Sequence, residues 1–264
     1  MKALLEKVDD VLATRTRPSE ALAILRDTAA LPHILELIRA DPARLIVAAR
    51  ASYRHRNGFD KIVLAAPPGS QLKLVLHLWR QDEVVGRDHI HNHRWDFASV
   101  VLLGALQLEL YKRDAEGATY IRMKYRKARS LNDGTRYRLE PCGTMPVSAA
   151  ASAILTVGST YTWSARLLHR AWALPGTTTA TLIVQGPPVR NRTSVLVDDE
   201  SQAIVRHESS ALRGLHVNDI DQTLAELATS SVATVWRRDI SDRGPSRRIS
   251  HFDGFCDARQ VASK

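Results

Sequence analysis

The densest group of residues capable of chemistry is a run of alternating histidines in the segment DHIHNHRWDF, positions 88–97. Alternate side chains of an extended strand share one face, so His89, His91 and His93 are expected to point the same way. Two imidazoles at this spacing can converge on one ion as neutral nitrogen ligands for iron, nickel, copper, zinc or manganese. A surface strand with exposed imidazoles is the alternative. The spacing therefore favours a site for one divalent transition metal.

The residues after the histidine pair resemble the first motif of the cupin superfamily. That motif has a His-x-His pair, three or four residues, a glutamate, six residues and a glycine. Here three residues separate His93 from Phe97, and six more lead to Gly104. Phe97 thus stands where the family often has a carboxylate ligand. One step along a strand turns a side chain to the opposite face, so we expect Phe97 to face the barrel interior and Asp96 to face away.

A second motif of the same family supplies a third histidine. It has a glycine, five residues, Pro-x-Gly, two residues and a histidine, and Gly158 and His169 keep that spacing. Ser164, Arg166 and Ala173 replace the usual proline, glycine and asparagine. The matched spacing in both halves makes His169 the expected partner of the histidine pair.

The resemblance covers roughly residues 70–188 and implies a barrel that holds one divalent metal through His91, His93 and His169. Three histidines without a carboxylate look like the three-histidine cupin dioxygenases. The implied ion is Fe(II), with nickel, manganese, zinc and copper as alternatives. The implied reaction is an oxygenation of a small polar metabolite by dioxygen. A lyase, isomerase or hydrolase on the same barrel, and a non-enzymatic ligand-binding cupin, stay open.

Five more residues near the expected ligands are candidates for the reaction. His89 could act as a general base or spare ligand, or line the barrel mouth. Tyr161 and Trp163 flank the second motif and could contact substrate or fill the barrel. Arg94 and Arg166 could clamp an anionic group of the substrate, since a guanidinium binds carboxylate or phosphate in a bidentate manner. Surface arginines would look the same in sequence.

Helices are expected before this region. Residues 3–52 carry apolar residues at helical spacing, and Pro18, Pro32 and Pro42 stand where new helices could start, because proline is tolerated in a first turn. A turn around Asn57-Gly58 ends this part of the chain. We expect residues 1–57 to form a helical N-terminal extension.

Short β-rich runs then follow one another, separated by turn signals at 114–117, 132–134 and 175–176. Many short strands at close spacing indicate a sandwich or barrel. The predicted fold is mainly β, a cupin-type jelly-roll barrel over residues 58–200 with helical extensions at both ends. The clearest runs are 72–79, 98–103, 105–111, 120–125, 153–157 and 180–184.

Residues 201–264 are expected to form a helical and irregular C-terminal extension. Asp219 followed by Gln222 resembles a capping box at the start of a helix. The tail from Arg237 is rich in arginine, serine, aspartate and glycine, a composition that favours poor order.

The amino-acid composition limits the kinds of molecule that this protein is expected to bind. The formal net charge is +9, but the alternating basic and apolar residues around 112–138 read as strand faces exposed to water, and no nucleic-acid-binding motif accompanies them. No apolar run approaches the roughly 20 residues needed to span a bilayer. Cys142 and Cys256 form no disulfide framework or metal motif. We expect a cytoplasmic enzyme that binds a small molecule, acts on neither nucleic acid nor membrane, and could form a homodimer.

Overall fold

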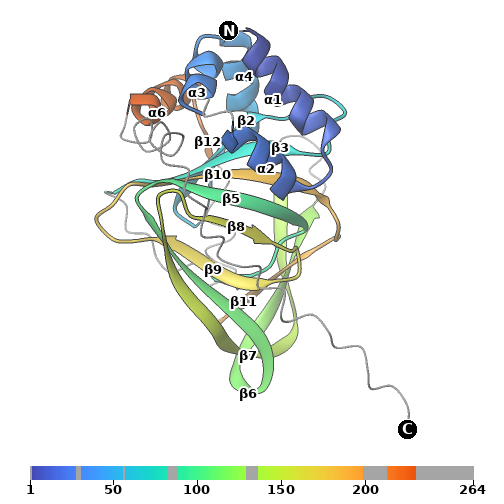
Figure 1. Ribbon diagram of the computed structural model, residues 1–264. Helices are drawn as coiled ribbons and strands as arrows, with labels where there is room; N and C mark the ends of the chain where they lie inside the picture. The colour runs from blue at the N-terminus through green and yellow to red at the C-terminus, as the bar shows by residue number, and fades with distance from the viewer. Residues whose placement is uncertain are drawn as a thin grey trace.

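The computed structural model describes residues 2–27, 31–55, 57–81, 89–128, 136–198 and 213–229. Within these ranges two antiparallel sheets form the body of the molecule, and the helices gather on the outer side of the larger sheet (Figure 1). The prediction of a mainly β fold, a cupin-type barrel with helical extensions, is confirmed.

Three of the described helices begin at or beside a proline. Helices α2 and α4 start at Pro18 and Pro42, and Pro32 is the second residue of α3. In α6 the carboxylate of Asp219 accepts a hydrogen bond from the His216 backbone nitrogen at 3.3 Å, so this helix starts two residues before the predicted cap. The described helices are α1 (Lys2–Thr14), α2 (Pro18–Asp27), α3 (Leu31–Arg39), α4 (Pro42–Ala51) and α6 (Val217–Thr229).

Asp41 caps helix α4, because its carboxylate accepts hydrogen bonds from the backbone nitrogens of Ala43 and Arg44 at 3.0 and 3.2 Å. We expect Asp41→Ala to lower the free energy of unfolding by about 1 kcal/mol, since two helix-start donors lose their acceptor. Asp41→Asn keeps an acceptor oxygen and should change little. Chemical denaturation measures both; equal stabilities for all three proteins would show that the cap contributes nothing.

The strands form a seven-stranded sheet in the order β12-β1-β2-β3-β10-β5-β8 and a five-stranded sheet in the order β11-β4-β9-β6-β7. In the larger sheet the strands are β1 (Tyr53–His55), β2 (Phe59–Ala65), β3 (Lys73–Trp79), β5 (Trp95–Leu103), β8 (Thr160–Trp163), β10 (Thr179–Pro188) and β12 (Arg213–Gly214). In the smaller sheet they are β4 (Ile90–His91), β6 (Ala105–Ala128), β7 (Arg136–Thr156), β9 (Leu168–Ala173) and β11 (Thr193–Val197).

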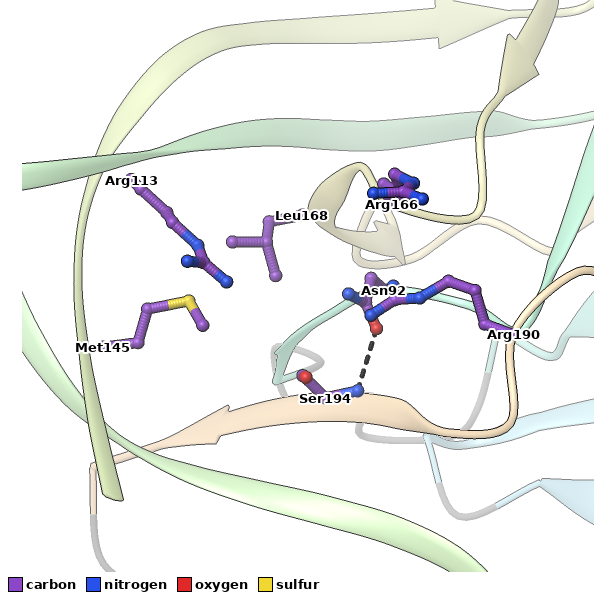
Figure 2. A pocket seen from close by; sticks show the side chains of 7 residues that line it. All are labelled: Asn92, Arg113, Met145, Arg166, Leu168, Arg190 and Ser194. Atoms are coloured by element: carbon purple, nitrogen blue, oxygen red, sulfur yellow. Dashed lines mark hydrogen bonds between the residues drawn. The ribbon is translucent and has the colours of Figure 1, made fainter. Parts of the chain in front are cut away.

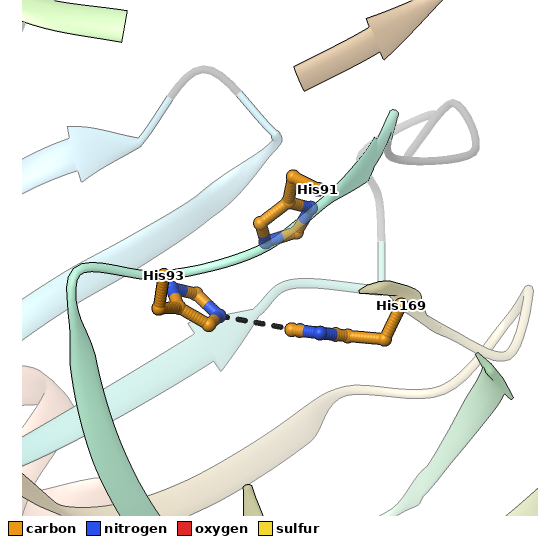
Figure 3. Close-up of side chains that lie close together, drawn as sticks. All are labelled: His91, His93 and His169. Carbon is orange, nitrogen blue, oxygen red and sulfur yellow. Dashed lines mark hydrogen bonds between the residues drawn. The ribbon is translucent and has the colours of Figure 1, made fainter. Parts of the chain in front are cut away.

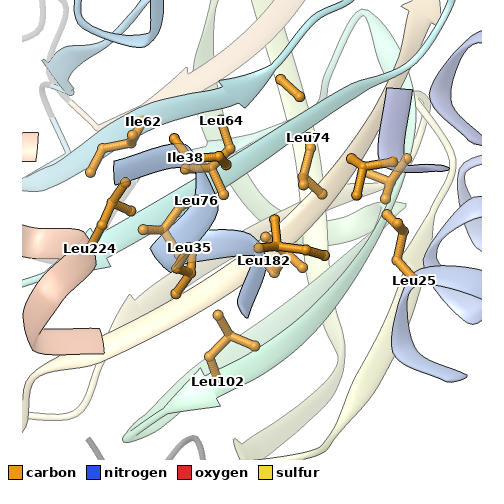
Figure 4. Packing of buried hydrophobic residues seen from close by; sticks show 14 of the residues in the cluster. Leu25, Leu35, Ile38, Ile62, Leu64, Leu74, Leu76, Leu102, Leu182 and Leu224 are labelled. Atoms are coloured by element: carbon orange, nitrogen blue, oxygen red, sulfur yellow. The ribbon is translucent and has the colours of Figure 1, made fainter. Parts of the chain in front are cut away.

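Both faces of the seven-stranded sheet are buried, and alternate residues separate them. One face packs under the helices, where Leu76 and Leu102 meet Leu35 of α3 and Leu224 of α6 (Figure 4). The other face carries a separate cluster of side chains: Val75, Phe97, Leu108, Trp163 and Ile183. Because this cluster includes Leu108 of the smaller sheet, it fills the space between the two sheets. Phe97 of β5 therefore points into the barrel.

The five-stranded sheet carries a long hairpin of β6 and β7 that corrects one prediction. The runs 105–111 and 120–125 belong to a single strand, and the turn predicted at 114–117 is a bulge where the register shifts between Arg113 and Ala118. Asp114 accepts hydrogen bonds from Glu116 N at 3.2 Å and Ser148 Oγ at 2.7 Å, so the turn-forming residues satisfy each other inside the hairpin. The turn predicted at 132–134 lies outside the described residues.

The helices and the larger sheet share one apolar core, so the helical extension is packed onto the barrel. The boundaries 1–57, 58–200 and 201–264 stay a prediction, as does a homodimer, and the tail from Arg237 lies outside the described residues. Among the helices that the structure describes, none is both long and apolar enough to cross a membrane.

Candidate metal centre

Three histidines from separate parts of the chain converge between the two sheets. Strands β4 and β9 pair so that His91 lies directly opposite His169, and His93 follows β4. Each histidine offers a ring nitrogen, and these atoms lie within 4.8 Å of one another. The Nε2 atoms of His93 and His169 are 3.2 Å apart (Figure 3). The structure thus brings together the three residues that the motif spacing predicts as ligands.

Backbone carbonyls orient two of the imidazoles. His91 Nδ1 lies 2.8 Å from the carbonyl oxygen of His89, and His169 Nδ1 lies 3.3 Å from that of Leu167. A carbonyl only accepts, so these contacts assign the proton of each ring to Nδ1, and Nε2 is then the ring nitrogen that carries the lone pair. Metal-binding histidines are commonly fixed in this way.

The cluster also suits a cation electrostatically. Burial lowers the pKa of His169 to about 3, with a further contribution from His91. Burial likewise lowers the pKa of His93 well below its usual range, and the other two histidines add to the effect. Buried imidazoles that resist protonation are neutral nitrogen donors near neutral pH.

The spacing of the nitrogens fits a shared ion. Two nitrogen ligands that each lie about 2.1 Å from one metal are about 3.0 Å apart when neighbouring bonds meet at the right angle of an octahedron. They are about 3.4 Å apart when the bonds meet at the tetrahedral angle. The 3.2 Å between His93 Nε2 and His169 Nε2 lies between these values. The donor set fits a divalent transition metal.

No carboxylate joins the three histidines in the part of the chain that the structure describes. Phe97 occupies the position of the motif glutamate, is 6% exposed, and packs edge-on against His93 at 5.0 Å between ring centroids. Asp96 instead accepts a hydrogen bond from the backbone nitrogen of Ala165 at 2.6 Å. The predicted directions of Phe97 and Asp96 are confirmed.

Asp96 holds the turn that leads into His169. Its partner Ala165 is 1% exposed, and the Ala165 carbonyl accepts a hydrogen bond from His93 N at 3.3 Å. One residue of the turn is therefore tied to both ligand-bearing segments.

We expect Asp96→Ala to weaken metal binding about 10-fold, since changes beside metal ligands typically cost 10–100-fold. The buried Ala165 N–H also loses its acceptor, at a cost of about 1–3 kcal/mol in stability. Asp96→Asn keeps an oxygen acceptor and should retain most of both properties. Metal titration and thermal denaturation of the three proteins check this. Unchanged affinity in Asp96→Ala would show that the turn does not position His169.

Aromatic side chains wall the cluster on the side of the larger sheet. Trp163 stacks on His169 with ring centroids 5.6 Å apart and an 18° angle between planes. Tyr161 packs against Trp163 at 5.4 Å. Burial raises the pKa of Tyr161 to about 12, so its hydroxyl stays protonated. Trp163 and Tyr161 therefore offer an apolar wall and one neutral hydroxyl.

A polar row on the inner face of the larger sheet is absent from the sequence predictions. The strand register places Lys61 beside His77 and His77 beside Thr181. Lys61 Nζ donates a hydrogen bond to Gln185 Oε1 at 3.2 Å and lies 5.3 Å from the ring centroid of Trp95. Trp95 in turn contacts the ring of the metal-site residue His93 at 5.7 Å.

Electrostatics connect this row to the cluster. Burial lowers the pKa of Lys61 to about 8, and repulsion from Lys73 and Arg94 adds to the shift. The charge of Lys61 in turn contributes to the lowered pKa of His93. Thr181 Oγ1, in the same row, is buried and has no hydrogen-bond partner among the described residues. The row therefore offers a cation and a spare hydroxyl to a polar ligand.

The remaining candidates occupy different positions. Arg94 lies over the ring of Trp95 at 5.2 Å, near the polar row. Arg166 is exposed in the turn before β9 and lines a pocket with Leu168. His89 supplies its carbonyl to His91, and its ring nitrogens are not part of the three-histidine group. Catalytic roles for His89, Tyr161 and Arg166 stay predictions.

Comparisons with known proteins add little to this geometry. No family model matches the chain, and no curated protein matches it. The solved hydroxypropylphosphonic acid epoxidase from S. wedmorenis is similar with a TM-score of 0.30 and 15% identity, over 49% of this chain and 51% of that chain. KdgF from Halomonas sp. is similar with a TM-score of 0.27 and 15% identity, over 49% of this chain and 81% of that chain. Hydroquinone 1,2-dioxygenase PnpCD is similar with a TM-score of 0.31 and 15% identity, over 55% of this chain and 72% of that chain.

The chain thus matches about half the length of the epoxidase. Similarities this weak do not carry an activity from one protein to another. The function has to be argued from the residues of the site.

Proposed function

We propose that this protein is a metal-dependent enzyme that oxygenates a small anionic metabolite. The observation that carries the proposal is the convergence of His91, His93 and His169 without a carboxylate among the described residues. The positive side chain of Lys61 in the same barrel interior supports an anionic substrate. Three neutral ligands leave the full charge of a divalent ion uncompensated, which favours the same class of substrate.

Different side chains of the protein would have different roles in this reaction. The three imidazoles would hold the ion, and Asp96, through Ala165, keeps the segments of His93 and His169 in register. When bound, Fe(II) supplies Lewis acidity and one-electron redox chemistry. The protein orients the substrate and excludes water around it.

Lys61 is suited to hold the anionic group of the substrate. Its ammonium already donates to Gln185, so its direction is fixed before a ligand arrives. A charge-assisted hydrogen bond from a buried ammonium is stronger than a neutral one. Trp163 and Phe97 line the apolar side, where they limit access of water to the reacting atoms.

The experiment is oxygen uptake by iron-loaded protein over a panel of small acids, thiols and amino acids. We expect uptake that depends on one substrate class and disappears when zinc replaces iron. Turnover under strict anaerobiosis, undiminished with zinc, would contradict an oxygenase and identify a lyase or hydrolase. The His93→Ala variant is the control, since it keeps the barrel but lacks one ligand.

A further inference from the structure

A polar pocket apart from the metal centre lies on the outer side of the five-stranded sheet. Its volume is about 200 Å³, and Figure 2 shows side chains from strands β6, β7, β9 and β11 and from the segments between strands around it. This volume is smaller than that of pockets for drug-sized ligands, which is about 300–1,000 Å³. The pocket therefore fits one small ligand or one head group. The lining residues are Asn92, Arg113, Met145, Arg166, Leu168, Arg190 and Ser194.

This pocket is separate from the metal centre. Asn92 lies between His91 and His93, and Leu168 precedes His169, so their side chains point away from the histidines. Leu168 packs in a cluster with Met145 and four other buried residues, and this cluster is separate from the one that contains Phe97 and Trp163. The two sites therefore share backbone segments but lie on opposite faces of the sheet.

Positive charge gathers at the pocket without an opposite charge. Arg113, Arg166 and Arg190 line it, and no carboxylate of the described chain pairs with any of them. Burial lowers the pKa of Arg190, and repulsion from Arg166, Arg122, Arg192 and Arg113 lowers it further. A bound counter-charge would relieve this repulsion.

Fixed neutral groups complete the pocket. Arg190 Nη1 donates to the Ala165 carbonyl at 3.1 Å, which leaves its other donors available. The Asn92 side-chain oxygen accepts from Ser194 N at 2.8 Å, and no described residue accepts from the Asn92 amide nitrogen. Asn92 and Ser194 are 5% and 2% exposed. The hydrogen bond to its oxygen thus orients the Asn92 amide, whose nitrogen is a donor in the same pocket lining as the guanidinium groups.

We propose that this pocket binds a small multiply charged anion, a phosphate group or a polycarboxylate, at a site distinct from the metal centre. Guanidinium groups match the oxygens of both chemistries through paired hydrogen bonds. Leu168 and Met145 supply an apolar side that limits the hydration of the bound group. Because Arg190 binds Ala165, and Ala165 accepts from His93 N, an anion here also contacts the turn that positions the metal ligands.

The test is isothermal titration of the full chain with inorganic phosphate, pyrophosphate and citrate, each against potassium chloride at equal ionic strength. We expect one saturable site per chain, and the relative affinities of the three anions distinguish the phosphate source from the carboxylate source. Arg190→Gln and Arg166→Gln should each weaken binding about 10- to 100-fold, the effect of losing a hydrogen bond to a charged group. Arg50→Gln, an exposed change on α4 with the same loss of charge, should not.

The His169→Ala variant separates this site from the metal centre and from the proposed enzyme activity. Anion binding that survives in His169→Ala and is lost in Arg190→Gln supports the pocket, whatever the metal centre does. Anion binding that is lost in His169→Ala and retained in Arg190→Gln places the anion on the metal and overturns the proposal. So does the absence of any saturable binding above chloride, or saturation by a short oligonucleotide alone.

Discussion

Replacing His169 with alanine is expected to weaken metal binding by more than about 100-fold and to abolish metal-dependent activity. Changes beside a metal ligand typically cost 10–100-fold in affinity, and His169 is one of the ligands themselves. Its ring centroid lies 4.7 Å from that of His91 and 4.9 Å from that of His93, and its loss leaves two donors. Competition titration with a chromogenic chelator measures the affinity of each protein.

His33→Ala is the matched control, because His33 is an exposed histidine on helix α3 that pairs with Glu36. We expect it to bind metal like the native protein. Equal affinities in native protein, His33→Ala and His169→Ala would show that the metal binds elsewhere. Circular dichroism of each variant shows whether the barrel is retained.

The second large effect is expected at Lys61. Lys61→Met keeps the length and apolar stem of the side chain but removes its charge and its hydrogen bond to Gln185. We expect kcat/KM for the anionic substrate to fall about 10- to 100-fold, from the roughly 1.5–3 kcal/mol of a hydrogen bond to a charged group. Lys7→Met, an exposed change on α1, should leave kcat/KM unchanged. Steady-state kinetics on the iron-loaded proteins decide this.

The pH profile gives Lys61 an independent signature. With its pKa lowered to about 8, the native ammonium loses its proton as pH rises through 8, so kcat/KM for an anion should fall there. The profile of kcat/KM reports groups of the free enzyme. Lys61→Arg stays charged and should not show this fall. Identical profiles in the native protein and Lys61→Arg would remove Lys61 from the substrate site.

The sequence predicted most of what forms the metal cluster. The His-x-His pair and the position of His169 follow fixed spacings, and strand parity alone placed Phe97 inside and Asp96 outside. The prolines of the helices act locally, so their positions also predicted where helices begin. The histidine pair, the strand parity and the prolines depend on neighbouring residues, which a single sequence displays directly, whereas His169 followed from the resemblance to the second cupin motif.

Other features depend on strand register and could not be read in advance. Lys61 lies far along the chain from Trp95 and Gln185, and only the pairing of β2, β3 and β10 brings them together. Arg113 belongs to a basic stretch that was interpreted as a solvated face. Arg113 is indeed exposed, and it also lines the pocket with Arg166 and Arg190, a proximity that the sequence does not display. In the β6–β7 hairpin, residues 114–117 form a bulge and not the predicted turn, because strand pairing resumes directly after these residues.

The most direct test of the metal centre is X-ray absorption at the metal edge of full-length protein prepared without a His tag and loaded with one equivalent of Fe(II). A site built from His91, His93 and His169 predicts three imidazole nitrogen ligands at about 2.0–2.2 Å, and fewer than three in His93→Ala. A shell dominated by sulfur or carboxylate oxygen, or an unchanged number of three imidazole ligands in His93→Ala, would contradict it.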